Sequence, residues 1–164
     1  MSDYLADAFQ RVFEHIEHDG IKKGVDEKGI DKFINECAML AGITGFASGV
    51  GGFATMIVGV PVDVINNIVQ QFRVTLAVIY IKKGSYTVPS FKDFMKIVGM
   101  SVGVEVGAVF TQAVLVTIAG QILTRMTAST AAKAIPLLGG AIGAGVNYGF
   151  IKAIGASLKK IDLK

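Results

Sequence analysis

Apolar side chains recur along this chain at the three- and four-residue spacing that is typical of helices. Residues 3–18 show this spacing on one face, and further helices are predicted over 61–83 and 137–158. No stretch keeps the strict alternation of apolar and polar residues that a half-buried strand shows. The pattern therefore predicts an all-α fold: a compact bundle of five to seven helices packed through Gly/Ala-rich faces.

Glycine, proline and cap residues divide the pattern into elements. The helix over 61–83 is expected to end at Gly84, which is suited to the position after a helix. Ser90 with Asp93 three residues later has the form of a capping box and predicts a helix from 91 to about 126. We expect the breaks between helices near residues 20–28, 50–53, 84–89 and 127–136.

Small residues recur at four-residue intervals within the apolar segments. The stretch from Cys37 to Val62 carries no charge and is rich in Gly, Ala, Ser and Thr. On a helix, such a stripe lets another helix approach closely. The pattern predicts a glycine zipper, with helix-packing positions at Gly45, Gly49, Gly99, Gly103, Gly107, Gly139 and Gly143.

The helix over 61–83 also carries a polar face. One interpretation is a solvated face, and the other is a hydrogen-bonded stripe that lines a cavity or an interface, for which amides are suited. Glu105 is expected inside the apolar helix over 91–126, with Arg73 as its buried partner. A ligand-binding or proton-linked role and plain exposure are the alternatives for Glu105. The candidate cluster, ligand-binding or structural, comprises Asp63, Asn66, Asn67, Gln70, Arg73, Glu105, Gln112 and Asn147.

The composition is strongly apolar: 52% of residues are hydrophobic and 18% are charged, against roughly 25% charged in average proteins. We expect one domain over 1–164, with an amphipathic helix and loop over 1–28 and a Gly-rich apolar core over 29–164. The net charge of +3 is too small to indicate a nucleic-acid partner. The single cysteine, Cys37, fits a reducing compartment.

The sequence lacks two common nucleotide-binding motifs and a complete set of metal ligands. The chain has neither G-x-x-x-x-G-K-[ST] nor G-x-G-x-x-G. His15 and His18 lie three residues apart, but a metal site there would need a ligand from elsewhere. We therefore expect no metal, no cofactor and no catalytic residue. An enzyme that uses Glu105 or Arg73 is the less favoured hypothesis.

Two stretches of the chain resemble a known family. They are Val60–Asp63, followed by a helix with Arg73 and Tyr80, and the run from Ile135 to Asn147. Together they resemble the EcsC family over roughly residues 35 to 158. The resemblance implies a helical and mostly bacterial protein without a settled enzymatic activity, from a family named after an operon that encodes a secretion-linked ABC transporter. For Asp63, Arg73 and Asn147 it implies family-wide positions that hold helices together.

These expectations favour a non-enzymatic helical protein in a membrane-related or secretion-related context. It would bind a lipid, another apolar ligand or the membrane surface, and a protein partner is a further expectation. The alternative is an integral or conditionally inserting membrane protein, of the hydrophobic hairpin or pore type. We expect a cytoplasmic location, either free, peripheral to the membrane or inserted in it.

Overall fold

The computed structural model describes residues 2–43, 59–128 and 139–163, and the following statements concern those residues. They form helices and no strand, which confirms the all-α prediction. The helices are α1 (Ser2–His15), α2 (His18–Lys28), α3 (Ile30–Gly42), α5 (Val62–Lys83), α6 (Phe91–Ser101), α7 (Gln112–Ala128) and α8 (Gly139–Lys160). The predicted break at 50–53 and most of the one at 127–136 lie outside the described residues.

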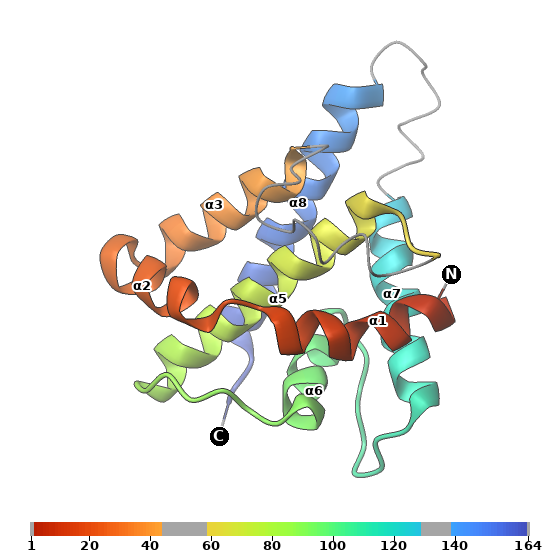
Figure 1. Ribbon diagram of the computed structural model, residues 1–164, viewed down its shortest axis with the longest axis horizontal. Helices are drawn as coiled ribbons and strands as arrows, with labels where there is room; N and C mark the ends of the chain where they lie inside the picture. Colours follow the sequence, from red (N-terminus) through yellow and green to blue (C-terminus); the bar gives the residue numbers. More distant parts are fainter. Residues whose placement is uncertain (1, 44–58, 129–138, 164) are drawn as a thin grey trace.

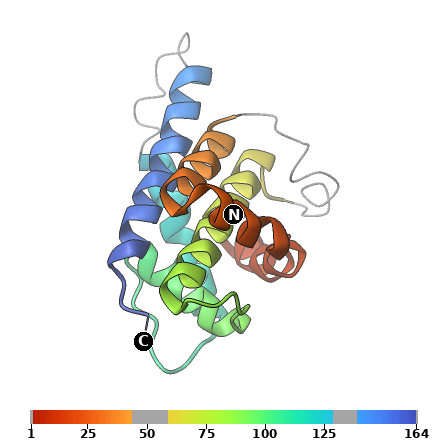
Figure 2. The same ribbon diagram turned by 90° about the vertical axis from the view of Figure 1, so that its left-hand side faces the viewer.

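Helix α5 runs through the middle of the bundle (Figure 1). It contacts α1, α2, α3, α6 and α8, and fourteen of its 22 residues are buried. Helices α8 and α1 lie on opposite sides of α5, and α3 lies beside α8 (Figure 2). Helix α1 crosses the bundle and packs on α7 as well as on α5.

Phenylalanine rings join three helices in the core. The centroid of Phe72 on α5 lies 5.8 Å from that of Phe9 on α1 and 4.8 Å from that of Phe94 on α6. The Phe13 ring lies 4.8 Å from Phe94. Aromatic pairs at these separations add about 0.5–1.5 kcal/mol each beyond the area they bury. The cluster thus holds α1 and α6 against α5.

Helix α5 ends, and α6 begins, as the cap residues predict. Gly84 adopts a left-handed conformation, with φ of 67°, and its N–H donates to the carbonyl of Tyr80. Ser90 accepts a hydrogen bond from the backbone N–H of Asp93 and donates one to the Asp93 carboxylate. The predicted break over 84–89 is confirmed.

The prediction of one helix from 91 to about 126 is wrong, because the chain leaves α6 at Gly103. Gly103 has φ of +79°, its N–H donates to the Met100 carbonyl, and the Val104 N–H donates to the Gly99 carbonyl. This pair of bonds is a Schellman motif, which satisfies the last carbonyls of a helix. Gly103 is therefore a stop signal rather than part of a helical stripe.

The prediction of a loop over 20–28 is also wrong, since these residues form most of α2. Ile21 and Val25, four residues apart, are buried in the core. Gly24 packs against the Phe33 ring, where a Cβ atom would lie 2.8 Å from the ring. Gly24 therefore lets α2 approach α3.

One described helix, α5, is long and apolar enough to cross a membrane by length and composition alone. Of its most apolar window, 78% is buried inside the protein. The core helix of a globular bundle passes the same test, so this finding is weak evidence for a membrane span.

Gly103→Ala should lower the free energy of unfolding by about 1–2 kcal/mol, because alanine must adopt a left-handed conformation there. Gly107→Ala is the matched control: Gly107 has no positive φ, and a Cβ atom there would meet no described atom within 4 Å. Urea unfolding of both variants compares the two sites. If the two variants had the same free energy of unfolding, the claim that the left-handed conformation of Gly103 ends α6 would be refuted.

Candidate functional site

The polar face of α5 points into the bundle. Asn66, Asn67 and Gln70 are at most 5% exposed, so the interpretation as a solvated face is wrong for these three residues. Asp63, in the first turn of the helix, is exposed. Sequence reasoning missed Gln71 and Thr75, which are fully buried on the same helix. They lie four and eight residues after Asn67, a spacing that puts all three on one face of the helix and so could have predicted their burial.

A line of hydrogen bonds connects this face to α3. The Asn66 amide donates to the Leu40 carbonyl over 3.0 Å, and Gln70 Nε2 donates to Asn66 Oδ1 over 3.2 Å. Arg73 Nη1 then donates to Gln70 Oε1 over 2.9 Å. Each group satisfies its neighbour, so the buried amides stabilise the junction of α3 and α5.

A second line of buried polar groups faces α6. Asn67 Nδ2 donates to the Asp63 carbonyl, and the Thr75 hydroxyl donates to the Gln71 carbonyl. Gln71 Nε2 lies 3.5 Å from Ser101 Oγ. The oxygens Asn67 Oδ1 and Gln71 Oε1 are buried without a hydrogen-bond partner among the described residues. This second line is therefore less well satisfied than the first.

Arg73 lies over the Phe33 ring and does not pair with Glu105. Its guanidinium carbon is 5.4 Å from the centroid of the Phe33 ring. Burial raises the pKa of Cys37 to about 11, and the positive charge of Arg73 offsets part of that rise. Cys37 is therefore a protonated, structural thiol at neutral pH.

The prediction that Glu105 pairs with Arg73 inside the bundle is wrong. Glu105 is exposed and lies between α6 and α7, because Gly103 ends α6 two residues earlier. Gln112, at the start of α7, donates to Asp7 Oδ1 on α1 over 2.8 Å and is also exposed. Asn147 is buried on α8. The structure thus gathers Asn66, Asn67, Gln70 and Arg73 and leaves Glu105 and Gln112 elsewhere.

The predicted packing glycines have different surroundings. Gly99 is closely packed, since a Cβ atom there would lie 2.9 Å from Val106 and 3.1 Å from Ile118 of α7. Gly107 is not: no described atom lies within 4 Å of its Cβ position. Gly45 and Gly49 lie outside the described residues, as do the surroundings of Gly139 and Gly143.

Residues 99–103 read G-x-S-x-G, a pattern of hydrolase nucleophiles that sequence reasoning missed. In such enzymes the serine is exposed on a turn from a strand to a helix. Here Ser101 is the last residue of α6, is 1% exposed, and donates to the Val98 carbonyl over 2.6 Å. The geometry does not fit a nucleophile.

An apolar groove of about 440 Å³ lies beside α7 and α8. Gly145 and Gly149 line it, and a Cβ atom at either would meet no described atom within 4 Å. Among the described residues of the lining, Arg125 of α7 carries the charge. The other lining residues are Val146, Phe150, Ala153 and Ile154. The volume is within the range of about 300–1,000 Å³ that small-molecule sites occupy.

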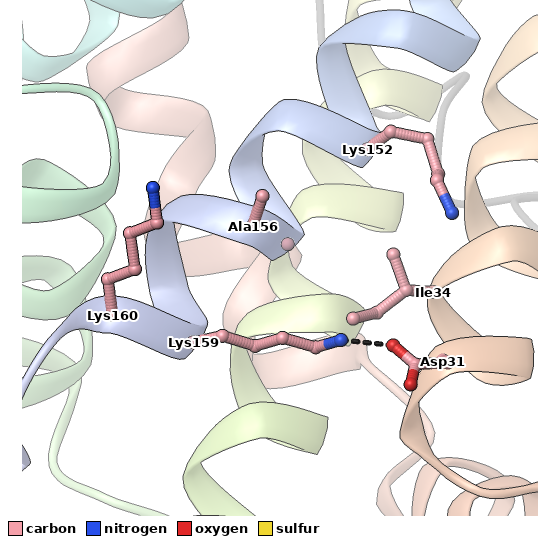
Figure 3. A pocket seen from close by; sticks show the side chains of 7 residues that line it. Asp31, Ile34, Lys152, Ala156, Lys159 and Lys160 are labelled. Atoms are coloured by element: carbon pink, nitrogen blue, oxygen red, sulfur yellow. Dashed lines mark hydrogen bonds and ion pairs between the residues drawn. The ribbon is translucent and has the colours of Figure 1, made fainter.

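A second groove, of about 320 Å³, lies between α3 and α8 (Figure 3). Ile34 and Gly155 bring the two helices together, since a Cβ atom at Gly155 would lie 2.8 Å from Ile34. Lys159 of α8 pairs across the groove with Asp31 of α3. Lys152 also lines the groove, so its lining is basic.

The described part of the chain has no group of three or more His, Cys, Asp or Glu side chains placed to hold a metal ion. Comparisons with known proteins add no assignment: no protein-family model matches the chain, and no curated protein or solved structure is similar to it. The resemblance to the EcsC family therefore stays a prediction from the motif residues.

Double-mutant cycles test the rearranged polar network. Arg73→Met and Gln70→Leu should couple by about 0.5–3 kcal/mol, because the two side chains share a hydrogen bond. Arg73→Met and Glu105→Gln should show no coupling, and Glu105→Gln alone should change the free energy of unfolding by less than about 0.5 kcal/mol. A large coupling between Arg73 and Glu105 in urea unfolding would contradict the structure.

Cys37 should react slowly with a thiol reagent in the native protein at pH 8. Its pKa of about 11 leaves little thiolate, whereas an unfolded cysteine has a pKa near about 8.5. The measurement is the rate of modification by DTNB in buffer and in urea. Complete modification at the same rate in both solutions would show that Cys37 is accessible and ionised.

Proposed function

We propose that this chain is a non-enzymatic helical protein that binds an anionic, single-chain lipid in the groove between α7 and α8. The observation that carries the proposal is the lining of this groove. Among the described residues it combines Gly145 and Gly149, whose Cβ positions meet no described atom within 4 Å, with apolar walls and the guanidinium of Arg125. An acyl chain would occupy the apolar part, and the acidic headgroup would lie at the guanidinium.

The small residues of α8 support this proposal. Gly145, Gly149 and Ala153 succeed one another at intervals of four, so they lie on one face of the helix. From Gly145 to Ala153 the helix rises by roughly 12 Å. An elongated apolar ligand is suited to such a channel, because each buried methylene contributes about 0.8 kcal/mol.

A second candidate function, contact with a membrane surface, is favoured by exposed apolar side chains on α1, α3 and α5. Met39 and Ile43 near the end of α3, and Val62 at the start of α5, are each about half exposed. Tyr4 of α1 is 60% exposed and lies against Gly59. The sequence from Cys37 to Val62 carries no charge. Exposed apolar patches of this kind are typical of interaction surfaces.

Under the same proposal, the chain is a member of the EcsC family and acts in a membrane-related or secretion-related context. The support for this part is the motif resemblance alone. The buried line from Asn66 to Arg73 then has a structural role in joining α3 and α5, which agrees with the expectation for Arg73.

Gly149→Leu tests lipid binding. The Cβ atom of the leucine would meet no described atom within 4 Å, and the rest of its side chain would extend into the groove. The melting temperature should be unchanged or raised, since leucine favours a helix over glycine by about 1 kcal/mol. We expect calorimetric titration with dodecanoate to show binding to the original protein and none to Gly149→Leu. Lipid extraction and mass spectrometry of the purified protein should find a fatty acid or lysolipid.

Ala156→Leu is the matched control, because it introduces the same side chain on the same helix in the other groove. It should leave dodecanoate binding intact. Binding that survives Gly149→Leu, or no binding by the original protein, would refute the α7/α8 site. Flotation with vesicles and sedimentation of detergent-free extract then distinguish membrane-surface contact and insertion from a plain helical interaction module.

A further inference from the structure

The groove between α3 and α8 is distinct from the proposed lipid groove and is basic rather than apolar. It is lined by Asp31 and Ile34 of α3 and by Lys152, Gly155 and Lys159 of α8, with Ala156 and Lys160. In Figure 3 the ammonium group of Lys160 points away from Asp31, whereas Lys159 crosses the groove to the Asp31 carboxylate. Lys152 reaches along the side on which Ile34 and Asp31 lie.

The charges in this groove do not balance. Lys152 and Lys159 supply two positive charges on the side of Asp31, and that carboxylate supplies one negative charge. The pKa of Asp31 is lowered, mainly by its hydrogen bond from Lys159 and to a smaller extent by the charge of Lys152. Both lysines therefore act on the same volume, which retains an excess positive charge when the ion pair is formed.

The helix that carries these lysines is held in place near its end. Lys82 of α5 donates to the carbonyl of Lys159 over 2.9 Å and to the carbonyl of Ile161 over 2.5 Å. A cation that binds the last carbonyls is favourable at a helix C-terminus. Closer to the middle of α8, the Tyr148 hydroxyl donates to Asn35 of α3. The backbone of the groove is thus fixed, and the lysine side chains provide the adaptable part.

We propose that this groove binds a phosphate-type oxyanion between Lys152 and Lys159. In the free protein, the Asp31 carboxylate occupies the position on Lys159 that a phosphate oxygen takes in the complex. A doubly charged phosphate matches the charge of both lysines once the Asp31 carboxylate, whose side chain is 81% exposed, has turned to solvent; a single carboxylate does not match it. The volume of about 320 Å³ accommodates a phosphate group together with a small organic substituent. This site is independent of lipid binding between α7 and α8.

Substitutions in the groove should change the affinity for phosphate in different directions. The affinity is measured by titration with inorganic phosphate and with glycerol 3-phosphate, followed by NMR or calorimetry. Lys152→Gln and Lys159→Gln should each weaken binding roughly tenfold, through loss of one charged hydrogen bond. Asp31→Asn should strengthen binding by up to about fivefold, because it removes the internal competitor. Lys23→Gln, at an exposed lysine paired with Glu27, should leave binding unchanged.

Circular dichroism of each variant verifies that it is folded. The same variants are then tested on vesicles of phosphatidylcholine with and without phosphatidic acid. If the expected changes in binding by the variants are seen with the soluble phosphates, the ligand is a free phosphate. If they are seen only with vesicles that contain phosphatidic acid, the ligand is a lipid headgroup. The proposal would be overturned if Lys23→Gln and Lys152→Gln lost the same phosphate affinity, or if Asp31→Asn bound phosphate more weakly. It would also be overturned if the original protein bound neither the soluble phosphates nor the phosphatidic acid vesicles. Gly149→Leu should bind phosphate normally, so failure of the lipid groove would not be confused with failure of this site.

Discussion

The burial of the polar face of α5 is the constraint on which the arrangement of the other helices depends. An amide taken from water without a partner costs about 1–3 kcal/mol, so these side chains require donors and acceptors nearby. Asn66 finds its partner in the Leu40 carbonyl of α3, and Gln70 and Arg73 continue the line. Helix α5 is consequently placed against α3. On its other sides Phe72 packs against rings of α1 and α6.

Much of the fold could be predicted because its signals are local. Helical spacing, the Ser90 cap and the Gly84 stop each act through atoms within a few residues. Glycine was harder to interpret, because the same residue can end a helix, as Gly103 does, or allow close packing, as Gly24 does against Phe33. A helical Gly103 would put Glu105 inside an apolar helix, whereas the turn at Gly103 leaves Glu105 exposed. The basic groove could not be foreseen, because it joins Asp31 to Lys159 across more than a hundred residues.

Helix α8 links the two proposed sites, since it lines both grooves. Around Gly149 it presents small, open positions beside Arg125, and around Gly155 it packs closely on Ile34 between two lysines. The first environment suits an acyl chain with an acidic end, and the second suits a compact phosphate. Small residues thus have two effects on one helix: at Gly149 they leave a groove that no described side chain fills, and at Gly155 they let α8 pack closely on Ile34 of α3.

Helix α5 must be a core helix of a bundle that folds without a membrane, although it is long and apolar enough to span one. Hydrogen exchange of the backbone amides in detergent-free buffer tests this requirement most directly. We predict that the amides between Phe72 and Ile79 exchange most slowly, at the rate set by global unfolding, and that vesicles do not change this. Rapid exchange of α5 in buffer, with protection that arises only on addition of vesicles, would show that α5 is a membrane segment and would contradict the account.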